Sequence, residues 1–221
     1  MQNYRTIKVT GRGRLRLRPD TTRITATLAG VYKDYAEALE KSAGSTGEVC
    51  DALARCGFDR DDVKTVDFSV DTEYEGYEEN GVYKQRLRGY RYSHTVKFEF
   101  VPDNERLGRI ISALSGCESS PQFSISYTVS DKESVKKELL RQAVADAEEK
   151  AKVIAGAAGV RLGVICGINH ASGDLDLETV PIRAISAKMR VNDASGAGFG
   201  MNVTPDDIEV TDSVSVIRYI E

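Results

Sequence analysis

The sequence lacks the features that mark membrane-spanning and exported proteins. None of its apolar runs approaches the roughly 20 residues that a membrane-spanning helix needs. The first residues, from Met1 to Val9, pass directly into a strand-like pattern and contain no run suited to a signal peptide. We therefore expect a cytoplasmic protein without a transmembrane segment, unless a leader precedes this chain.

Cysteine and histidine are also scarce. The four cysteines form no Cys-x-x-Cys pair and lie in apolar surroundings, so we expect buried structural thiols at Cys50, Cys56, Cys117 and Cys166. The two histidines, His94 and His170, have no neighbours at metal-ligand spacing, and no Gly-x-Ser-x-Gly motif is present. Gly11-Arg12-Gly13 lacks the third glycine and the helical context of a dinucleotide-binding loop. The sequence thus predicts no cofactor, no metal and no catalytic centre.

The composition indicates an ordinary globular protein. Hydrophobic residues make up 41% of the 221 residues and charged residues 29%, which excludes a disordered chain. The formal net charge of -4 argues against a general nucleic-acid binder, because neutralising phosphates requires a basic surface.

Strand and helix periodicities alternate along the chain and predict an α+β fold in the order β-β-α-β-β-α-β-α-β-β. We expect an antiparallel sheet with helices packed on one face, forming a single domain over residues 1–221. Residues 21–129 follow the split β-α-β order of ferredoxin-like folds. The first two strands, on either side of Pro19-Asp20, are predicted to form a hairpin.

The longest predicted helix begins at Ser130 or Asp131 and ends at Gly159. Alanine recurs every fourth residue on its apolar stripe, so this helix can lie close to the element it packs against. Residues 172–204 are rich in glycine and polar residues, with a faint periodic patch at 182–189. We expect a flexible loop there.

A long β-ribbon is predicted over about residues 65–100, with strands at 65–79 and 82–101 joined by Asn80-Gly81. A two-residue turn sets the register and brings acidic and basic stripes together on one face. That face carries the cross-strand neighbours Tyr77–Lys84, Glu75–Arg86 and Glu73–Arg88. A one-residue slip would move every charge to the wrong face, so we expect the charges to specify the register and largely to cancel.

The same register contains a conflict. It places Val96 and Phe98 on the face of the basic residues, and one face cannot be both core and charged. Either a bulge intervenes near residues 89–93, or the tip projects from the body and only its base packs. We favour a projecting arm with a bulge that packs on a neighbouring subunit. The register also places His94 opposite Asp67, as a base and its orienting carboxylate would lie, but we favour a strand residue with a local partner.

Arginines occupy alternate positions of the first strand and therefore share one face: Arg12, Arg14, Arg16 and Arg18. This stripe is either an anion-binding surface, for nucleic acid, acidic lipid or a partner, or a solvated or subunit-facing sheet surface. The negative net charge and the absence of interleaved aromatic residues count against nucleic acid. We favour the solvated or self-interface interpretation and expect no nucleic-acid partner.

Several motifs, in their order and spacing, resemble the SIMPL domain, a domain of unknown function. They are Ile7-x-Val9-x-Gly11-x-Gly13, Pro19-Asp20, Ile24, Tyr74-x-x-Tyr77, Gly89-Tyr90-x-Tyr92, Ser130-Asp131, the ladder Ala143, Ala147, Ala151 and Ala155, Leu162-Gly163, and Ile208-x-Val210. The resemblance implies an α+β fold and large, hollow, ring-like or barrel-like homo-oligomers. It also implies relatives that are exported and linked to stress tolerance, a mammalian relative that is a signalling adaptor, and no established catalytic residues.

We therefore predict a non-enzymatic, self-assembling protein, a homo-oligomeric scaffold or chamber that could bind a protein partner or shelter cargo and have a part in stress tolerance. Its candidate interaction residues are Arg12, Arg14, Arg16, Arg18, Glu73, Glu75, Lys84, Arg86 and Arg88. One alternative is a monomeric or dimeric adaptor that acts through the basic strand face or the loop at 172–204. Another is a hydrolase built around His94 or His170.

Overall fold

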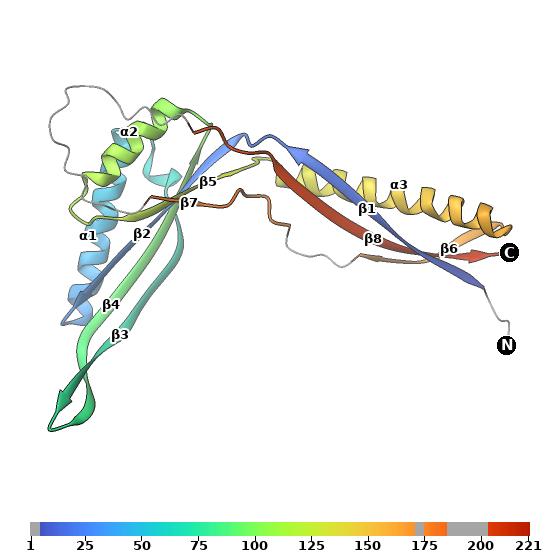
Figure 1. Ribbon diagram of the computed structural model, residues 1–221. Coiled ribbons are helices and arrows are strands. Elements are labelled where there is room, and N and C mark those ends of the chain that lie inside the picture. Colours follow the sequence, from blue (N-terminus) through green and yellow to red (C-terminus); the bar gives the residue numbers. More distant parts are fainter. Residues whose placement is uncertain (1–4, 171–174, 185–202) are drawn as a thin grey trace. The chain divides into compact units, whose positions relative to one another are not determined.

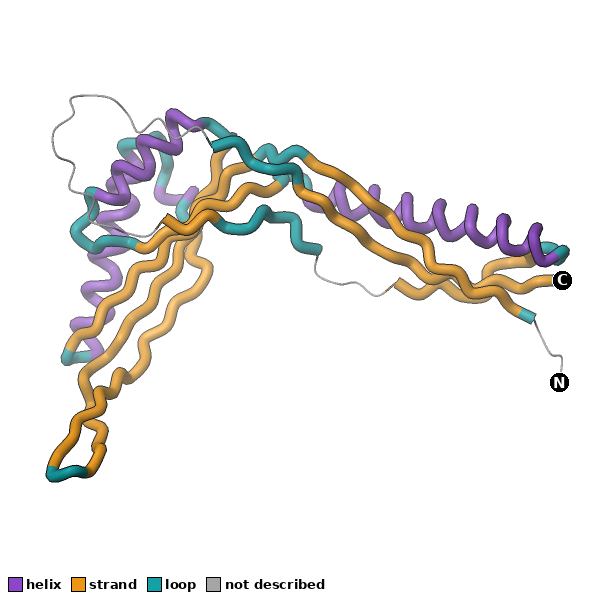
Figure 2. Tube along the Cα trace, viewed as in Figure 1, coloured by secondary structure: helices purple, strands orange, loops and turns teal. Residues whose placement is uncertain are grey.

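The computed structural model describes residues 5–170, 175–184 and 203–221, and it confirms the predicted α+β fold (Figures 1 and 2). The elements are β1 (Thr6–Leu17), β2 (Thr21–Tyr32), α1 (Tyr35–Ala54), the short 3-10 helix η1 (Arg60–Asp62), β3 (Lys64–Glu79), β4 (Val82–Phe100), α2 (Asn104–Ser115), β5 (Gln122–Thr128), α3 (Lys132–Ala158), β6 (Leu162–His170), β7 (Ile182–Ala184) and β8 (Ile208–Ile220).

The chain divides into two compact units, which we name by their place in the sequence. The central unit comprises residues 20–127 and 180–204, and the terminal unit comprises residues 1–19, 128–179 and 205–221. The assignment of residues 1–221 to a single domain stays a prediction. Where one sheet was expected, the strands form two.

The central unit has the predicted split β-α-β arrangement. Its sheet has the order β3-β4-β2-β5-β7, so β4 lies between β2 and β3, and α1 connects the two flanking strands. Alternating residues of β2 and β4 face the helices, and a core of buried side chains forms there. Ile24, Leu28, Leu53, Phe98 and Ile110 are among the fully buried members of this core.

The terminal unit is a three-stranded antiparallel sheet, β1-β8-β6, with α3 packed on one face. Odd-numbered residues of β1 are turned toward the helix and even-numbered ones away from it. Gly11 and Gly13 bring the two backbones together: a Cβ atom built on Gly11 would lie 2.0 Å from the carbonyl oxygen of Ala143. The alanine stripe of α3 therefore does allow the close packing that the sequence predicted.

The caps of α3 lie where they were predicted. Asp131 is the N-cap and its carboxylate accepts a hydrogen bond from the backbone N–H of Ser134 at 2.9 Å. Gly159 ends the helix with a φ of 68°, in the left-handed region that favours glycine. The buried stripe includes Ala155, whereas the neighbouring Ile154 is exposed.

The predicted hairpin of the first two strands is wrong. β1 pairs with β8 and β2 pairs with β4, so the two strands belong to different sheets. The alternating pattern correctly indicates two strands on either side of Pro19, but it does not select their partners. Those partners follow from burial, because the inward residues of β1 fit against α3 and those of β2 complete the central core.

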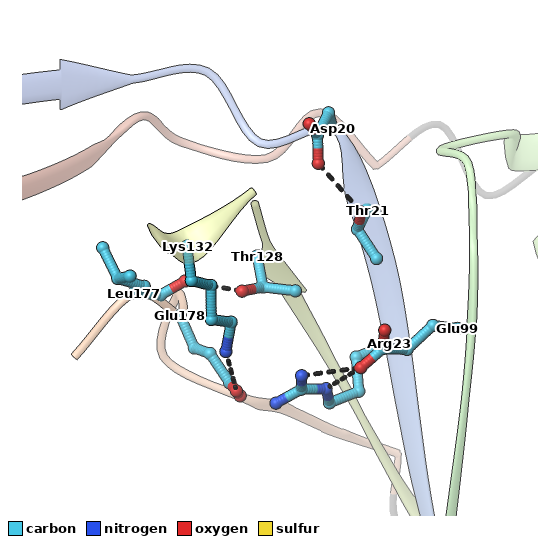
Figure 3. A network of polar contacts seen from close by, with 8 residues as sticks. All are labelled: Asp20, Thr21, Arg23, Glu99, Thr128, Lys132, Leu177 and Glu178. Atoms are coloured by element: carbon cyan, nitrogen blue, oxygen red, sulfur yellow. Dashed lines mark hydrogen bonds and ion pairs between the residues drawn. The ribbon is translucent and has the colours of Figure 1, made fainter. Parts of the chain in front are cut away.

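Part of the segment predicted as a flexible loop is ordered against its neighbours. Residues 182–184 form β7 on β5. In the terminal unit, the hydroxyl of Thr128 donates a buried hydrogen bond of 2.7 Å to the carbonyl oxygen of Leu177, and Lys132 pairs with Glu178 (Figure 3). In the central unit, Arg23 on β2 pairs with Glu99 on β4 (Figure 3). Residues 172–174 and 185–202 of the predicted loop lie outside the described residues.

Candidate interaction surfaces

The ribbon of β3 and β4 follows the predicted register near its turn. Asn80 and Gly81 both have positive φ and join the strands, so that Tyr77 lies opposite Lys84 and Glu75 opposite Arg86. Closer to the body the register shifts by one residue, and Glu73 lies opposite Gly89. The predicted cross-strand neighbours Glu73 and Arg88 are therefore not directly opposed, because Arg88 is the extra residue of a bulge.

This bulge resolves the conflict between the charged and the buried faces. It lies next to residues 89–93, where a bulge was predicted. The extra residue reverses the inward and outward alternation of β4. The basic residues near the tip therefore share a face with Arg91, whereas the buried Tyr92 lies on the other face. Gly89 permits the bulge: its φ is 149°, and a Cβ atom there would lie 2.1 Å from the carbonyl oxygen of Tyr32. The shift also places His94 opposite Phe68, so the predicted opposition of His94 and Asp67 is wrong.

Ion pairs occupy the charged face of the ribbon. Arg86 pairs with Glu75 at 2.6 Å, and Lys84 pairs with Glu79 at 2.6 Å. Glu73 is bound by both nitrogens of Arg91, at 2.6 and 2.7 Å, and lies 3.8 Å from Arg88. The hydrogen bond from Arg91 is the main reason why the pKa of Glu73 lies below its usual range. The role of Arg91 was missed, because it depends on the bulge.

The tip of the ribbon extends past the strand that supports its base. β2 ends at Tyr32, opposite Tyr90, and within the described part of the chain no third strand lies beside the residues of β3 and β4 nearer the turn (Figure 1). We call residues 74–87 the arm. Tyr35, at the start of α1, makes an edge contact with Tyr90 at 5.7 Å, which marks the end of the helical cover.

One face of the arm is apolar and open. Tyr74 lies directly opposite Leu87, and Tyr83 lies across Gly76 on the same face. Their exposed fractions are 59% for Tyr74, 49% for Leu87 and 74% for Tyr83. From Phe68 to the turn, the even-numbered residues of β3 form this face, so it continues the helix-covered face of the central sheet. The arm is thus a ribbon with ion pairs on one side and, on the other, uncovered aromatic and aliphatic side chains beside Glu78 and Gln85.

The arginine stripe lies on the open face of the terminal sheet. Arg12, Arg14 and Arg16 are exposed on β1, and Arg18 is exposed just after it, while Leu15 and Leu17 lie on the opposite face and pack against the buried cluster that contains Leu139. Arg16 forms an ion pair with Asp207 at 2.8 Å. The stripe borders hydroxyl side chains of β8, including Ser213 opposite Arg12.

Side chains of α3 cap the outer edge of β1. The carboxylate of Asp146 accepts a hydrogen bond from the backbone N–H of Arg12 at 2.6 Å, and the amide oxygen of Gln142 accepts one from Arg14 at 3.2 Å. The ammonium group of Lys150 donates to the carbonyl oxygen of Thr10. Hydrogen bonds from Lys150, first, and from Arg12 hold the pKa of Asp146 below its usual range. This edge is therefore closed to another strand.

The opposite edge of the same sheet, β6, is apolar and exposed. Val164, Ile165 and Ile168 have exposed fractions of 71%, 46% and 58%. Cys166 is exposed as well, which corrects the prediction that all four cysteines are buried. Cys117 is the buried one, and burial raises the pKa of its thiol.

The two histidines lie in different settings. His94 bridges two threonines, with Nδ1 2.8 Å from the hydroxyl of Thr46 and Nε2 3.0 Å from that of Thr65, and burial lowers its pKa. Both ring nitrogens are thus engaged in holding α1 against β3. His170 on β6 has Nε2 2.9 Å from the carboxylate of Asp212 on the neighbouring β8. In the described ranges, no three His, Cys, Asp or Glu residues group in a way that could hold a metal ion.

Comparison with known proteins relates nearly the whole chain to one family. Residues 7–217 match the model of SIMPL, described as a protein of unknown function (DUF541). The chain is 25% identical to the 26 kDa periplasmic immunogenic protein of Brucella melitensis (biotype 1, strain 16M) and to that of Brucella abortus (strain S19), each over 75% of this chain. The matched region spans 66% of each relative's length. Both relatives are named as periplasmic, whereas the N-terminal residues of this chain favoured the cytoplasm. No helix in the described ranges is long and apolar enough to cross a membrane.

Proposed function

The chain belongs to the SIMPL family of unknown function. We propose that it is a non-enzymatic protein that assembles with copies of itself into a homo-oligomeric scaffold. The observation that carries the proposal is the open apolar face of the arm, formed by Tyr74, Tyr83 and Leu87. A two-stranded ribbon is marginally stable in water without further cover. A second subunit that covers this face would stabilise the arm and bury two tyrosines, which are frequent anchors of protein interfaces.

The ion pairs on the other face support this role for the arm. They hold the register of a ribbon that has no third strand, because a slip would separate Arg86 from Glu75. The arm is thereby preorganised, which lowers the entropy lost when it binds. Its basic residues Lys84 and Arg86 are paired with carboxylates of the same ribbon, which argues against a polyanion as the partner of this face.

The test compares the two faces of the arm. We expect the wild-type chain to form a defined oligomer by size-exclusion chromatography with light scattering. The combined variant Tyr74→Ser, Tyr83→Ser, Leu87→Ser should have a lower mass, with unchanged helix content by circular dichroism. The matched control on the charged face, Glu75→Gln with Arg86→Gln, should keep the wild-type mass. An apolar-face variant that assembles like the wild type would refute the proposal.

An adaptor that works as a monomer or dimer is the second candidate, favoured by the exposed arginine stripe of Arg12, Arg14, Arg16 and Arg18. A wild-type chain that stays monomeric at every concentration would favour it. Substituting Arg12 and Arg14 by glutamine should then weaken partner binding without changing the oligomeric state. A hydrolase at His94 or His170 stays a third prediction, to be tested by substituting each histidine once an activity is found.

The relatives' names favour an exported protein over a cytoplasmic one. Cell fractionation of the natural gene product, with a cytoplasmic marker enzyme as a control, distinguishes the two locations. Enclosed cargo and a part in stress tolerance stay predictions from the family resemblance.

A further inference from the structure

The outer edge of β6 differs from the other strand edges of the molecule in what its backbone and side chains present. The direction in which its backbone N–H and C=O groups point can be derived from the hydrogen bonds of β1. Thr10 and Arg12 use their outward C=O and N–H groups to bind α3, so the even-numbered residues of β1 point away from β8. In an antiparallel sheet this direction alternates from residue to residue.

The same alternation, followed from β1 across β8, shows which way the backbone N–H and C=O groups of β6 point. The odd-numbered residues of β8 point toward β6, and they bond to Gly167 and Asn169, which lie opposite Ile217 and Ser215. Ile168, between them, therefore points its N–H and C=O groups outward. Among the described residues, no strand other than β8 pairs with β6. The backbone of Ile168 is thus available to a further strand.

The side chain of Ile168 lies on the helix face of the sheet, because Ile168 is directly opposite the buried Val216. It is nevertheless exposed, since α3 packs chiefly on β1 and β8. A helix about 10 Å wide covers roughly two strands spaced about 4.8 Å apart, so the third strand of this sheet stays uncovered. Ile165, opposite Arg218, is exposed on this face for the same reason.

Charge distinguishes this edge from the others. No Asp, Glu, Lys or Arg occurs between Leu162 and His170. The edge strand β3 carries Asp67, Asp71 and Glu73, the edge strand β7 carries Arg183, and the edge of β1 is capped by α3. Charged residues and caps are the usual protection of a strand edge against pairing with another chain, and within the described ranges β6 has neither. A second β6 is a suitable partner, because antiparallel pairing of two identical uncharged strands brings no like charges together.

We infer that β6 pairs antiparallel with β6 of a second copy about a two-fold axis near Ile168. The inference rests on the proposed self-assembly and adds a second interface to the arm. The regular part of the strand, Gly167–His170, lies next to this axis, and the two register shifts of β6 lie before it. The pairing joins two three-stranded sheets into one of six strands and keeps both α3 helices on the same face.

The arrangement also covers the exposed apolar residues. The two uncovered strands lie side by side between the two helices, with Ile168 of each copy beside Ile168 of the other and Ile165 farther along the same face. Val144, exposed on α3, lies one turn before Glu148, the residue that binds Arg218. It is therefore on the flank of the helix that turns toward β6, and it adds to the same contact.

Crosslinking of Cys166 can test whether two β6 strands pair. Near a two-fold axis at Ile168, the two Cys166 residues lie roughly 5 to 14 Å apart, depending on the residue at the centre of the pairing. A short bismaleimide should therefore crosslink the wild-type chain into a covalent dimer under native conditions. The Cys166→Ser variant should give none, since the thiols of Cys50, Cys56 and Cys117 are less exposed.

Substitutions at Ile168 test the interface itself. We expect Ile168→Lys to weaken dimerisation at least tenfold, measured by sedimentation at decreasing concentration, and to abolish the crosslink. Ile168→Ala and Ile168→Pro both lose the side chain, but only proline also loses the outward N–H. Proline should therefore be about tenfold weaker than alanine, because the hydrogen bond is lost twice in a two-fold pair. If Ile168→Lys fails to fold, Val164→Lys on the same strand replaces it.

The outcomes separate this inference from the arm. The variant with three serines on the arm should still give the Cys166 crosslink. An oligomer that loses mass with the arm variant but keeps its crosslink and mass in Ile168→Lys would overturn the β6 interface and leave the proposed function standing. If the wild type is only a dimer, and the arm variant leaves both this dimer and its crosslink unchanged, the β6 interface is supported and the assembly role of the arm is overturned.

Discussion

The closest backbone approach in the terminal unit gives a sharp prediction at Gly11. In the substitution Gly11→Ala, the added methyl group would start 2.0 Å from the carbonyl oxygen of Ala143 and 2.4 Å from the backbone nitrogen of Ala147. An ordinary contact begins at 3.4 Å, so β1 and α3 must separate by more than one ångström. Both obstructing atoms belong to the helix backbone, and no side-chain rotation can relieve the overlap.

The separation would also strain the hydrogen bonds that cap the edge of β1. Asp146 and Lys150 reach the backbone of β1 from the same stretch of α3. Overpacking usually destabilises a protein by about 1–3 kcal/mol, and we expect about 3 kcal/mol here because rigid backbone stands on both sides. For a chain of this length, that lowers the melting temperature by about 6–12 °C.

Gly44→Ala is the matched control. A Cβ atom on Gly44, inside α1, meets nothing within 4 Å. Alanine there should stabilise the helix by about 0.5–1 kcal/mol. The two variants add the same methyl group and should shift stability in opposite directions.

Thermal unfolding and native-state hydrogen exchange measure the effect, and exchange localises it. Because the chain has two units, which need not unfold together, we expect Gly11→Ala to lower the protection of amides in α3 and β8 and to leave α1 unchanged. Equal stability of Gly11→Ala and Gly44→Ala would refute the backbone-to-backbone packing. So would a loss of protection centred on α1.

Two further predictions concern the bulge and the capped edge. Gly89→Ala puts a Cβ atom 2.1 Å from the carbonyl oxygen of Tyr32, at a φ of 149° that favours glycine. We expect it to destabilise the central unit by about 1–3 kcal/mol, measured by urea unfolding. A loss of stability under about 0.5 kcal/mol would contradict the bulge geometry. The lowered pKa of Asp146 means that its ionised form stabilises the fold above about pH 4 and that this contribution is lost as the pH falls through the lowered value. Wild type should therefore exceed Asp146→Asn in stability at pH 6, and the difference should shrink by pH 3; a pH-independent difference would show that the charge has no part.

The local features of the fold could be predicted because each depends on neighbouring residues. The turn at Asn80-Gly81 defines its own register for the first few residue pairs. Asp131 and Gly159 mark the ends of α3 through the capping needs of a helix. The split β-α-β order follows from the alternation of periodicities. The α+β class and the family could thus be predicted from the chain alone.

The candidate surfaces were predicted less completely. The stripe that contains Arg12 and the pair Glu75–Arg86 lie as predicted, since alternation and a nearby turn determine them. The pairing of Glu73 with Arg91 was missed, because it requires a bulge whose position depends on the contact of Gly89 with another strand. Gly11 was considered as part of a dinucleotide-binding loop and of a family motif, but not as a packing contact. Its spacing with Gly13, together with the alanine ladder, was a signal for close packing of a strand on a helix.

The amino-acid order alone specifies which face of each strand and helix is apolar, because periodicities of two and of about 3.6 residues are local properties. Which elements meet was decided by the tertiary structure. β1 pairs with β8, some 200 residues away in sequence, and its edge is capped by α3, whereas β6, which carries no charged residue, is exposed in the described part of the chain. Strand pairing and helix cover depend on the shapes of distant surfaces and on the limited width of one helix, so the alternation of apolar residues along a strand does not select its partners.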